Sequence, residues 1–237
     1  MKNEDWFLKV FGRIAIFIFF VILFLAWSVY PSEKHLNGED IVYIEAPYRA
    51  IDGSNVPIKI FANDKNNTFK KFTLKIDENP SPCCAIFEFH GIKAEVETNV
   101  RINAYTFLTV VGEDDYYSYI MRRYIKSAGG CSAPPLKDSN KPFGDMLIIK
   151  HKDIGYTTVK IYHPNYSGMQ YDTLRGSEIP ALYIESMLMY INGKKVFNYT
   201  GTIGIAQDVY FKLPVDTIHK EVYIEAYDNL GNKFTNK

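Results

Sequence analysis

The sequence predicts an all-β protein made of two antiparallel β-sandwich domains, and three observations carry this prediction. Apolar and polar residues alternate with a period of two over most of the chain after Pro31, and helical apolar stripes are nearly absent. Turn-forming residues interrupt the alternating runs at short intervals, as they do in sandwiches. The 237 residues exceed one average domain, which leaves room for two small ones after a targeting segment.

Three alternating runs, 70–76, 95–104 and 221–227, are expected to be half-buried strands. Their inward faces carry Phe72, Leu74, Ile76, Val96, Thr98, Val100, Ile102, Ala104, Val222, Ile224 and Ala226. The opposite face of the middle run is expected to lie in water and carries Glu95, Glu97, Asn99, Arg101 and Asn103. In 191–196, the dipeptide Asn192-Gly193 is the strongest hairpin signal of the chain.

The composition limits the classes of function. The chain is 47% hydrophobic, which favours folded cores over disorder, and its 27 basic and 27 acidic residues give no overall attraction for nucleic acid. The five histidines show no metal-ligand spacing, and the chain has no CxxC, GxSxG, Walker or Rossmann motif. We therefore expect no metal, no cofactor and no nucleotide or hydrolase chemistry.

The N-terminus is typical of an export signal. Three basic residues precede an uncharged run of fourteen residues that begins at Ile14. Ala26 and Ser28 suit cleavage by signal peptidase, whereas the apolar stretch through Tyr30 is just long enough to stay as an anchor. Residues 1–30 are thus expected to be a signal peptide or a signal anchor, which places the protein in the periplasm, free or held at the inner membrane.

Residues 128–144 interrupt the strand pattern and are rich in Gly, Pro, Ser and Asn, so they are expected to link a domain at 36–127 to a domain at 145–237. Cys131 lies in this linker behind two glycines. A free thiol in an oxidising compartment is prone to disulfide formation and overoxidation, which a simple linker would avoid. We therefore expect Cys131 to have a chemical function. An extended, flexible arm formed by Gly129, Gly130 and Ser132 would carry the sulfur clear of its domain. Bulky replacements at Gly130 or Ala133 should leave the fold unchanged.

Two further cysteines, Cys83 and Cys84, are adjacent in an expected strand and therefore point to opposite faces. One is expected to be a small core residue and the other a half-buried surface thiol. A vicinal disulfide, or a disulfide of either cysteine with Cys131, remains the alternative.

Four segments of the chain carry a family resemblance. Residues 40–60, DIVYIEAPYRAIDGSNVPIKI, together with 99–131, which end in YIKSAGGC, resemble the SoxY half of the periplasmic SoxYZ sulfur carriers. Residues 159–197, which begin VKIYHPNYSGMQ, and 222–234, VYIEAYDNLGNKF, resemble the SoxZ half. The fusion of both halves in one chain is most similar to the SoxYZ-like carriers that are associated with quinoprotein dehydrogenases.

The resemblance implies an immunoglobulin-like β-sandwich for each half and a covalent carrier without a catalytic site of its own. In the related carriers the cysteine, here Cys131, holds sulfur intermediates that begin as a cysteine S-thiosulfonate. The implied partners are periplasmic enzymes that act on the bound group, including a quinoprotein dehydrogenase and c-type cytochromes. The implied arm-contacting loop carries His163, Asn165, Gly168 and Met169, although a plain packing loop would have the same sequence.

Two other functions stay open. The chain could be a non-catalytic periplasmic accessory module of a quinoprotein (PQQ) dehydrogenase that holds no covalent cargo. A thiol enzyme fits less well, because a cysteine on a glycine stalk lacks the fixed base and oxyanion donors that activate a nucleophile in place.

Overall fold

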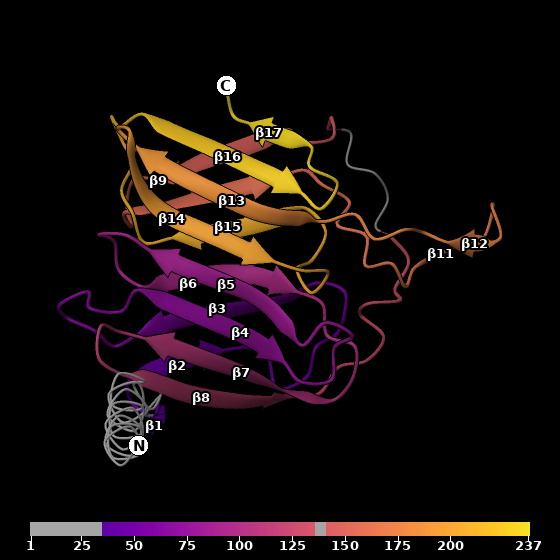
Figure 1. Ribbon diagram of the computed structural model, residues 1–237, viewed down its shortest axis with the longest axis horizontal. Helices are drawn as coiled ribbons and strands as arrows, with labels where there is room; N and C mark the ends of the chain where they lie inside the picture. Colours follow the sequence, from indigo (N-terminus) through magenta and orange to yellow (C-terminus); the bar gives the residue numbers. More distant parts are fainter. Residues whose placement is uncertain (1–34, 136–140) are drawn as a thin grey trace, which may run out of the picture. The chain divides into compact units, whose positions relative to one another are not determined.

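The computed structural model describes residues 35–135 and 141–237. The expected export segment, 1–30, lies outside the described residues. The described residues form strands and loops without a helix (Figure 1). The strands of the first half are β1 (His35–Asn37), β2 (Val42–Glu45), β3 (Val56–Ala62), β4 (Lys71–Ile76), β5 (Cys83–Phe89), β6 (Glu95–Val100), β7 (Thr106–Glu113) and β8 (Ser118–Ile125). Those of the second half are β9 (Met146–His151), β10 (Tyr156–Ile161), β11 (Tyr171–Asp172), β12 (Ser177–Glu178), β13 (Ile184–Ile191), β14 (Lys194–Gly201), β15 (Val209–Leu213), β16 (Val222–Asp228) and β17 (Lys233–Thr235).

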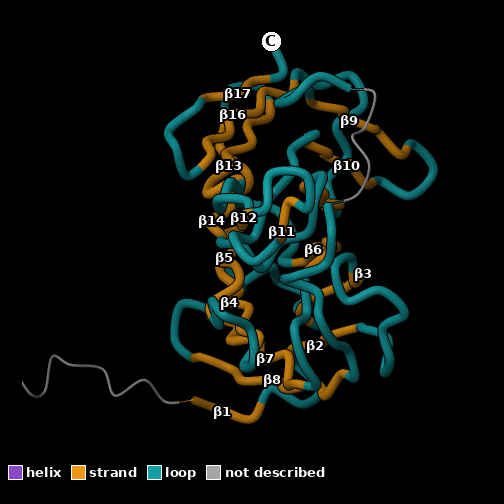
Figure 2. Tube along the Cα trace, turned by 90° about the vertical axis from the view of Figure 1, so that its right-hand side faces the viewer, coloured by secondary structure: helices purple, strands orange, loops and turns teal. Residues whose placement is uncertain are grey.

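Two sheets form the two layers of a sandwich, which Figure 2 shows side by side. The nine-stranded sheet has the order β1-β8-β7-β4-β5-β14-β13-β16-β17, and the six-stranded sheet has the order β2-β3-β6-β15-β10-β9. A separate two-stranded ribbon, β11–β12, projects beyond the ends of the sheets in Figure 1. The all-β prediction is confirmed for the described residues.

The two halves of the chain meet edge to edge in both layers. In the nine-stranded sheet β5 pairs with β14 in antiparallel register from Phe89↔Phe197 to Ala85↔Gly201. In the six-stranded sheet β6 pairs with β15 at Glu97↔Lys212. The sandwiches of the two halves therefore continue into each other through shared sheets and enclose one apolar core.

Alternation predicted the inward faces of the three runs correctly except at Ala104, which lies beyond the end of β6 and is only half-buried. The apolar residues of β4 and β16 are buried as expected, and Asn192 and Gly193 both have positive φ between β13 and β14, which is the geometry of a two-residue hairpin. The prediction that the outward face of the run 95–104 is exposed to solvent is wrong at Glu95 and Arg101, which are only 2% exposed. Glu95 is covered because it pairs with Lys59 at 2.8 Å, with Lys93 at 2.7 Å and with Tyr156.

The described ranges, 35–135 and 141–237, contain no helix long and apolar enough to cross a membrane. Within the same ranges, no three His, Cys, Asp or Glu side chains are grouped so that they could hold a metal ion.

Candidate functional site

The expected exposed stalk is instead packed structure. Cys131 has no solvent exposure, and Gly130 is buried beside it, whereas Gly129 and Ser132 are exposed. The backbone N–H groups of Gly129 and Gly130 donate to the carbonyl oxygens of Asn103 (2.7 Å) and Ile102 (3.0 Å). We refer to residues 128–135 as the cysteine arm. The arm lies in a fixed position against its own half because paired backbone groups hold it there.

Gly130 has a packing role that the sequence does not reveal. A Cβ on this residue would lie 2.0 Å from the carbonyl oxygen of Gly53 and 2.6 Å from that of Ile102, and atoms do not approach that closely. Gly53, in the turn that precedes β3, is itself crowded, since its own Cβ would lie 2.6 Å from the oxygen of Ala128. The expectation that bulk at Gly130 leaves the fold unchanged is therefore wrong, because two backbone segments touch at this point.

The second half covers the arm with residues 163–170, which we call the docking loop. The Ser167 hydroxyl donates to the carbonyl oxygen of Cys131, and the Gln170 side-chain amide donates to that of Ala133 at 3.0 Å. Both side chains are buried, and Gln170 Oε1 accepts a hydrogen bond from the Ser167 N–H, so each holds the other in place. The arm is thus attached to both halves of the molecule.

The start of the docking loop is fixed by a buried polar cluster. Asn165, with a φ of 45°, accepts a hydrogen bond from the Ile184 N–H and donates to the carbonyl oxygen of Ile205. His163 lies 2.8 Å from the Asn165 side chain and 4.0 Å from Asp228, and burial lowers the pKa of His163 to about 4. His163 is therefore neutral at neutral pH and serves as a packed support for the loop.

None of the four expected loop residues, His163, Asn165, Gly168 and Met169, forms a hydrogen bond with the arm in the described part of the chain. Gly168 has a φ of 84° and faces Ala181, so that a Cβ added to Gly168 would lie 3.2 Å from the Ala181 Cβ. The Met169 N–H donates to the Ser167 hydroxyl, and its side chain is 40% exposed. Gly168 and Met169 therefore shape the turn, whereas Ser167 and Gln170 hold the arm.

A buried arginine lies where arm and docking loop meet. Arg101 is 2% exposed, and its guanidinium donates to the carbonyl oxygen of Gly130 (3.3 Å) and to that of Asn165 (3.0 Å). Its own backbone is held by Gly204 and Asn79. The sequence placed Arg101 in water because strand alternation does not reveal that a distant loop covers the end of β6.

The thiol at 131 has two opposing influences on its charge. Burial raises the pKa of the Cys131 thiol above its ordinary value, and the positive charge of Arg101 acts against that rise. Among the described residues, no side chain forms a hydrogen bond with the Cys131 sulfur. The site therefore holds a thiol next to a cation without a general base in contact with it.

The other two cysteines have the expected arrangement. Cys84 is fully buried in the core and Cys83 is exposed, and all three cysteines are free, so neither disulfide alternative is formed. Burial raises the pKa of the Cys84 thiol strongly, and Cys131 adds to this rise by its charge. Cys84 is therefore an unreactive core residue.

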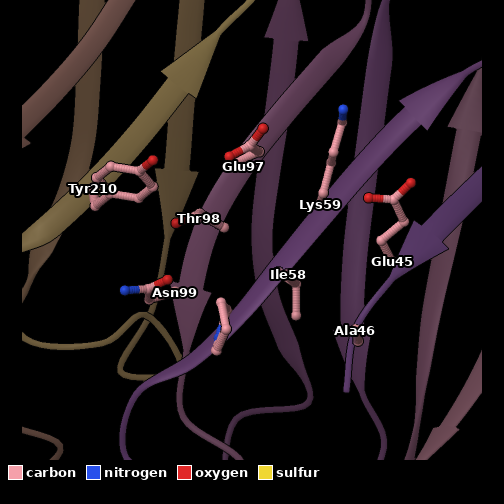
Figure 3. A pocket seen from close by; sticks show the side chains of 9 residues that line it. Glu45, Ala46, Ile58, Lys59, Glu97, Thr98, Asn99 and Tyr210 are labelled. Atoms are coloured by element: carbon pink, nitrogen blue, oxygen red, sulfur yellow. The ribbon is translucent and has the colours of Figure 1, made fainter. Parts of the chain in front are cut away.

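A groove of about 610 Å³ lies apart from this site, on the six-stranded sheet (Figure 3). Its lining comes from β2, β3, β6 and β15 and includes Lys59, Glu97 and Tyr210. Cys131 is not among its lining residues. The groove therefore does not receive the thiol in this conformation.

The fold and the site together define a class: a two-part β-sandwich that holds one glycine-flanked cysteine at the junction of its halves. Residues 28–131 match the family model described as "Sulfur oxidation protein SoxY", and residues 149–237 match the one described as "Sulphur oxidation protein SoxZ". The chain thus belongs to the SoxYZ family, as a fusion of both parts. Comparison with curated proteins finds no match to this chain.

SoxY and SoxZ proteins are carrier proteins of sulfur oxidation, generally without catalytic activity, that interact with other enzymes of that process. The SoxY match ends at Cys131 itself. The residues between 131 and 149 lie outside both matches.

Proposed function

We propose that this protein is an exported covalent carrier that presents a sulfur group on Cys131 to partner enzymes in the periplasm. The observation that carries the proposal is the position of Cys131: an unpaired thiol at the end of the SoxY-matching segment, behind two glycines. A carrier needs a thiolate that other proteins can load and unload, and it needs no base or oxyanion donors of its own. This fits a sulfur that no described side chain contacts by a hydrogen bond.

The arm has to leave its docked position for this function, because a fully buried sulfur cannot enter another enzyme. Hydrogen bonds from Ser167 and Gln170, and those to Asn103 and Ile102, hold the arm in place. Each contributes about 1 kcal/mol net, so a partner enzyme or thermal fluctuation can release a segment this short. We therefore infer two states of the carrier, one with the sulfur protected and one with it presented.

The inferred partners include a quinoprotein dehydrogenase and c-type cytochromes. Support for this part is the single-chain arrangement, which resembles the carriers associated with such dehydrogenases. The cargo is inferred to be derived from thiosulfate or a related sulfur compound, since sulfur oxidation is the process of both families.

Mass spectrometry of the protein from its own cells tests the proposal. We expect a mass increment that thiol reductants remove and that maps to the peptide containing Cys131. The increment should persist in Cys83→Ser and disappear in Cys131→Ser. A chain that carries only free thiol at 131, with cellular sulfur oxidation unchanged in Cys131→Ser, would show instead an accessory module without covalent cargo.

A further inference from the structure

A buried arginine without a charge partner needs a physical reason. The guanidinium of Arg101 has five N–H donors, and two of them are used on the carbonyl oxygens of Gly130 and Asn165. Its Nε is buried and has no hydrogen-bond partner in the described part of the chain. No carboxylate within 35–135 or 141–237 forms an ion pair with it either, although Asp52 acts on its charge from further away. Burying a charge in this way costs several kcal/mol unless an opposite charge joins it.

The position of Arg101 indicates where that opposite charge belongs. Its Nη1 contacts the carbonyl of Gly130, the peptide unit directly before Cys131, and its positive charge acts on the sulfur of that residue. A guanidinium remains protonated even when burial lowers its pKa, as it does for Arg101. A fixed cation is therefore next to a residue whose sulfur becomes negative each time it reacts.

We propose that Arg101 is the counter-ion of Cys131. Its buried guanidinium stabilises the negative charge of the thiolate on the Cys131 sulfur, and later the negative charge of a terminal sulfonate on the sulfur group bound there. The inference rests on the proposed carrier function and adds to it the residue that stabilises the charge of the cysteine and of its cargo. Arg101 acts as a positioning and charge-stabilising residue. A cargo anion on Cys131 is therefore expected to add attraction for the docked position.

The first test measures the charge on the thiol directly. The rate of iodoacetamide alkylation at Cys131, read from its peptide by mass spectrometry, is followed against pH in the full chain. The plateau at high pH reports access to the sulfur, whereas the pH dependence reports the thiolate fraction. In Arg101→Gln we expect the rate at neutral pH, relative to the plateau, to fall about tenfold or more, because the cation no longer favours the thiolate.

Two matched variants separate charge from structure. Arg122→Gln removes the same charge from an exposed arginine that pairs with Asp77, and it should leave the alkylation profile unchanged. Arg101→Lys keeps the charge but not the two-carbonyl fork, so it should alter the plateau and preserve the pH dependence. If Arg101→Gln changes only the plateau, Arg101 is a structural link and the inference is overturned.

A second test uses the natural residue at 101 and so does not depend on the folding of a variant. The thiolate of Cys131 attacks a central sulfur of tetrathionate, forms a new S–S bond and expels thiosulfate, which leaves a –S–SO₃⁻ cap. Methyl methanethiosulfonate leaves a –S–CH₃ cap by the same displacement and expels methanesulfinate. Both reactions are carried out on Cys83→Ser, which removes the exposed thiol.

The two caps differ only at the end group, a sulfonate against a methyl. If Arg101 is a counter-ion, the chain with the larger but anionic cap has the higher Tm. A lower Tm than with the methyl cap would contradict the inference. Both tests are made on purified protein and neither looks for the cellular adduct, so a failure here leaves the adduct at Cys131 unaffected, and a missing adduct leaves the alkylation profile unaffected.

Discussion

At the scale of single residues, two neighbouring glycines have different functions. Gly129 has a φ of 68°, a left-handed conformation that other residues adopt at a cost, and only the Ser132 hydroxyl lies within 4.0 Å of where its Cβ would be. Gly130 allows the arm to touch the turn at Gly53. The sequence does not distinguish the two glycines. Only the structure shows that Gly129 is needed for its backbone conformation and Gly130 for the close approach to Gly53.

This difference predicts unequal effects of one added methyl group. Gly129→Ala should lose about 1–2 kcal/mol of unfolding free energy, because it strains φ without a clash. Gly130→Ala should lose at least about 2–3 kcal/mol, because either the overlap with Gly53 persists or the arm leaves its site and gives up its hydrogen bonds. Urea denaturation measures both values. Equal losses would indicate that the contact between residues 53 and 130 is loose.

Arg101 illustrates where residue-level inference from sequence ends. Alternation predicted correctly that Val96, Val100 and Ile102 face the core, because a strand fixes the direction of each side chain locally. What covers the opposite face depends on chain more than sixty residues away, at Asn165. Neither periodicity nor composition predicts the contact between Arg101 and Asn165.

At the scale of elements, the arm and the docking loop work as a pair. The arm has no regular secondary structure, and its position depends on side chains from Ser167 and Gln170 as well as on its backbone. The sequence predicted a break in the strand pattern at 128–144, a cysteine in it and a loop after 163. It predicted an extended stalk because flexibility is the default for Gly-rich chain, whereas contacts with a distant loop decide the conformation.

The loop should control how often the sulfur is exposed. In Ser167→Ala, Gln170→Ala the docked arm loses two hydrogen bonds of about 1 kcal/mol each, so alkylation of Cys131 should become roughly tenfold faster or more. The pH dependence of the rate should not change, since Arg101 is intact. Peptide-level mass spectrometry gives both quantities.

Ser177→Ala is the control, because it removes a hydroxyl from the exposed β12 strand beyond the docking loop. If the double variant and this control are alkylated at the same rate, the docking loop does not restrain the arm.

At the scale of the whole described fold, the halves are joined by a shared aromatic cluster. Phe87 of β5 lies with its ring centroid 6.3 Å from Phe197, 6.0 Å from Tyr199 and 6.0 Å from Phe211, all from the second half. All four rings are fully buried. The sequence predicted a sandwich for each half from local strands, but the pairing of β5 with β14 is a long-range choice that local patterns do not specify.

A shared core predicts one unfolding transition. Phe87→Ala in the first half and Phe211→Ala in the second should each lose about 3–5 kcal/mol, because each removes a ring from the same cluster. Hydrogen exchange followed by mass spectrometry should show peptides of both halves losing protection together. Two transitions, each shifted by only one of the variants, would mean that the halves fold separately.

The edge-to-edge junction has a further consequence for how this protein is made. In a half synthesised alone, β5 or β14 in one sheet and β6 or β15 in the other would be open sheet edges with unpaired N–H and C=O groups. Such edges are templates for pairing with other chains and for aggregation. Since both halves come from one ribosome in equal number, every such strand is produced together with the strand that covers it, and no free half accumulates in the cell.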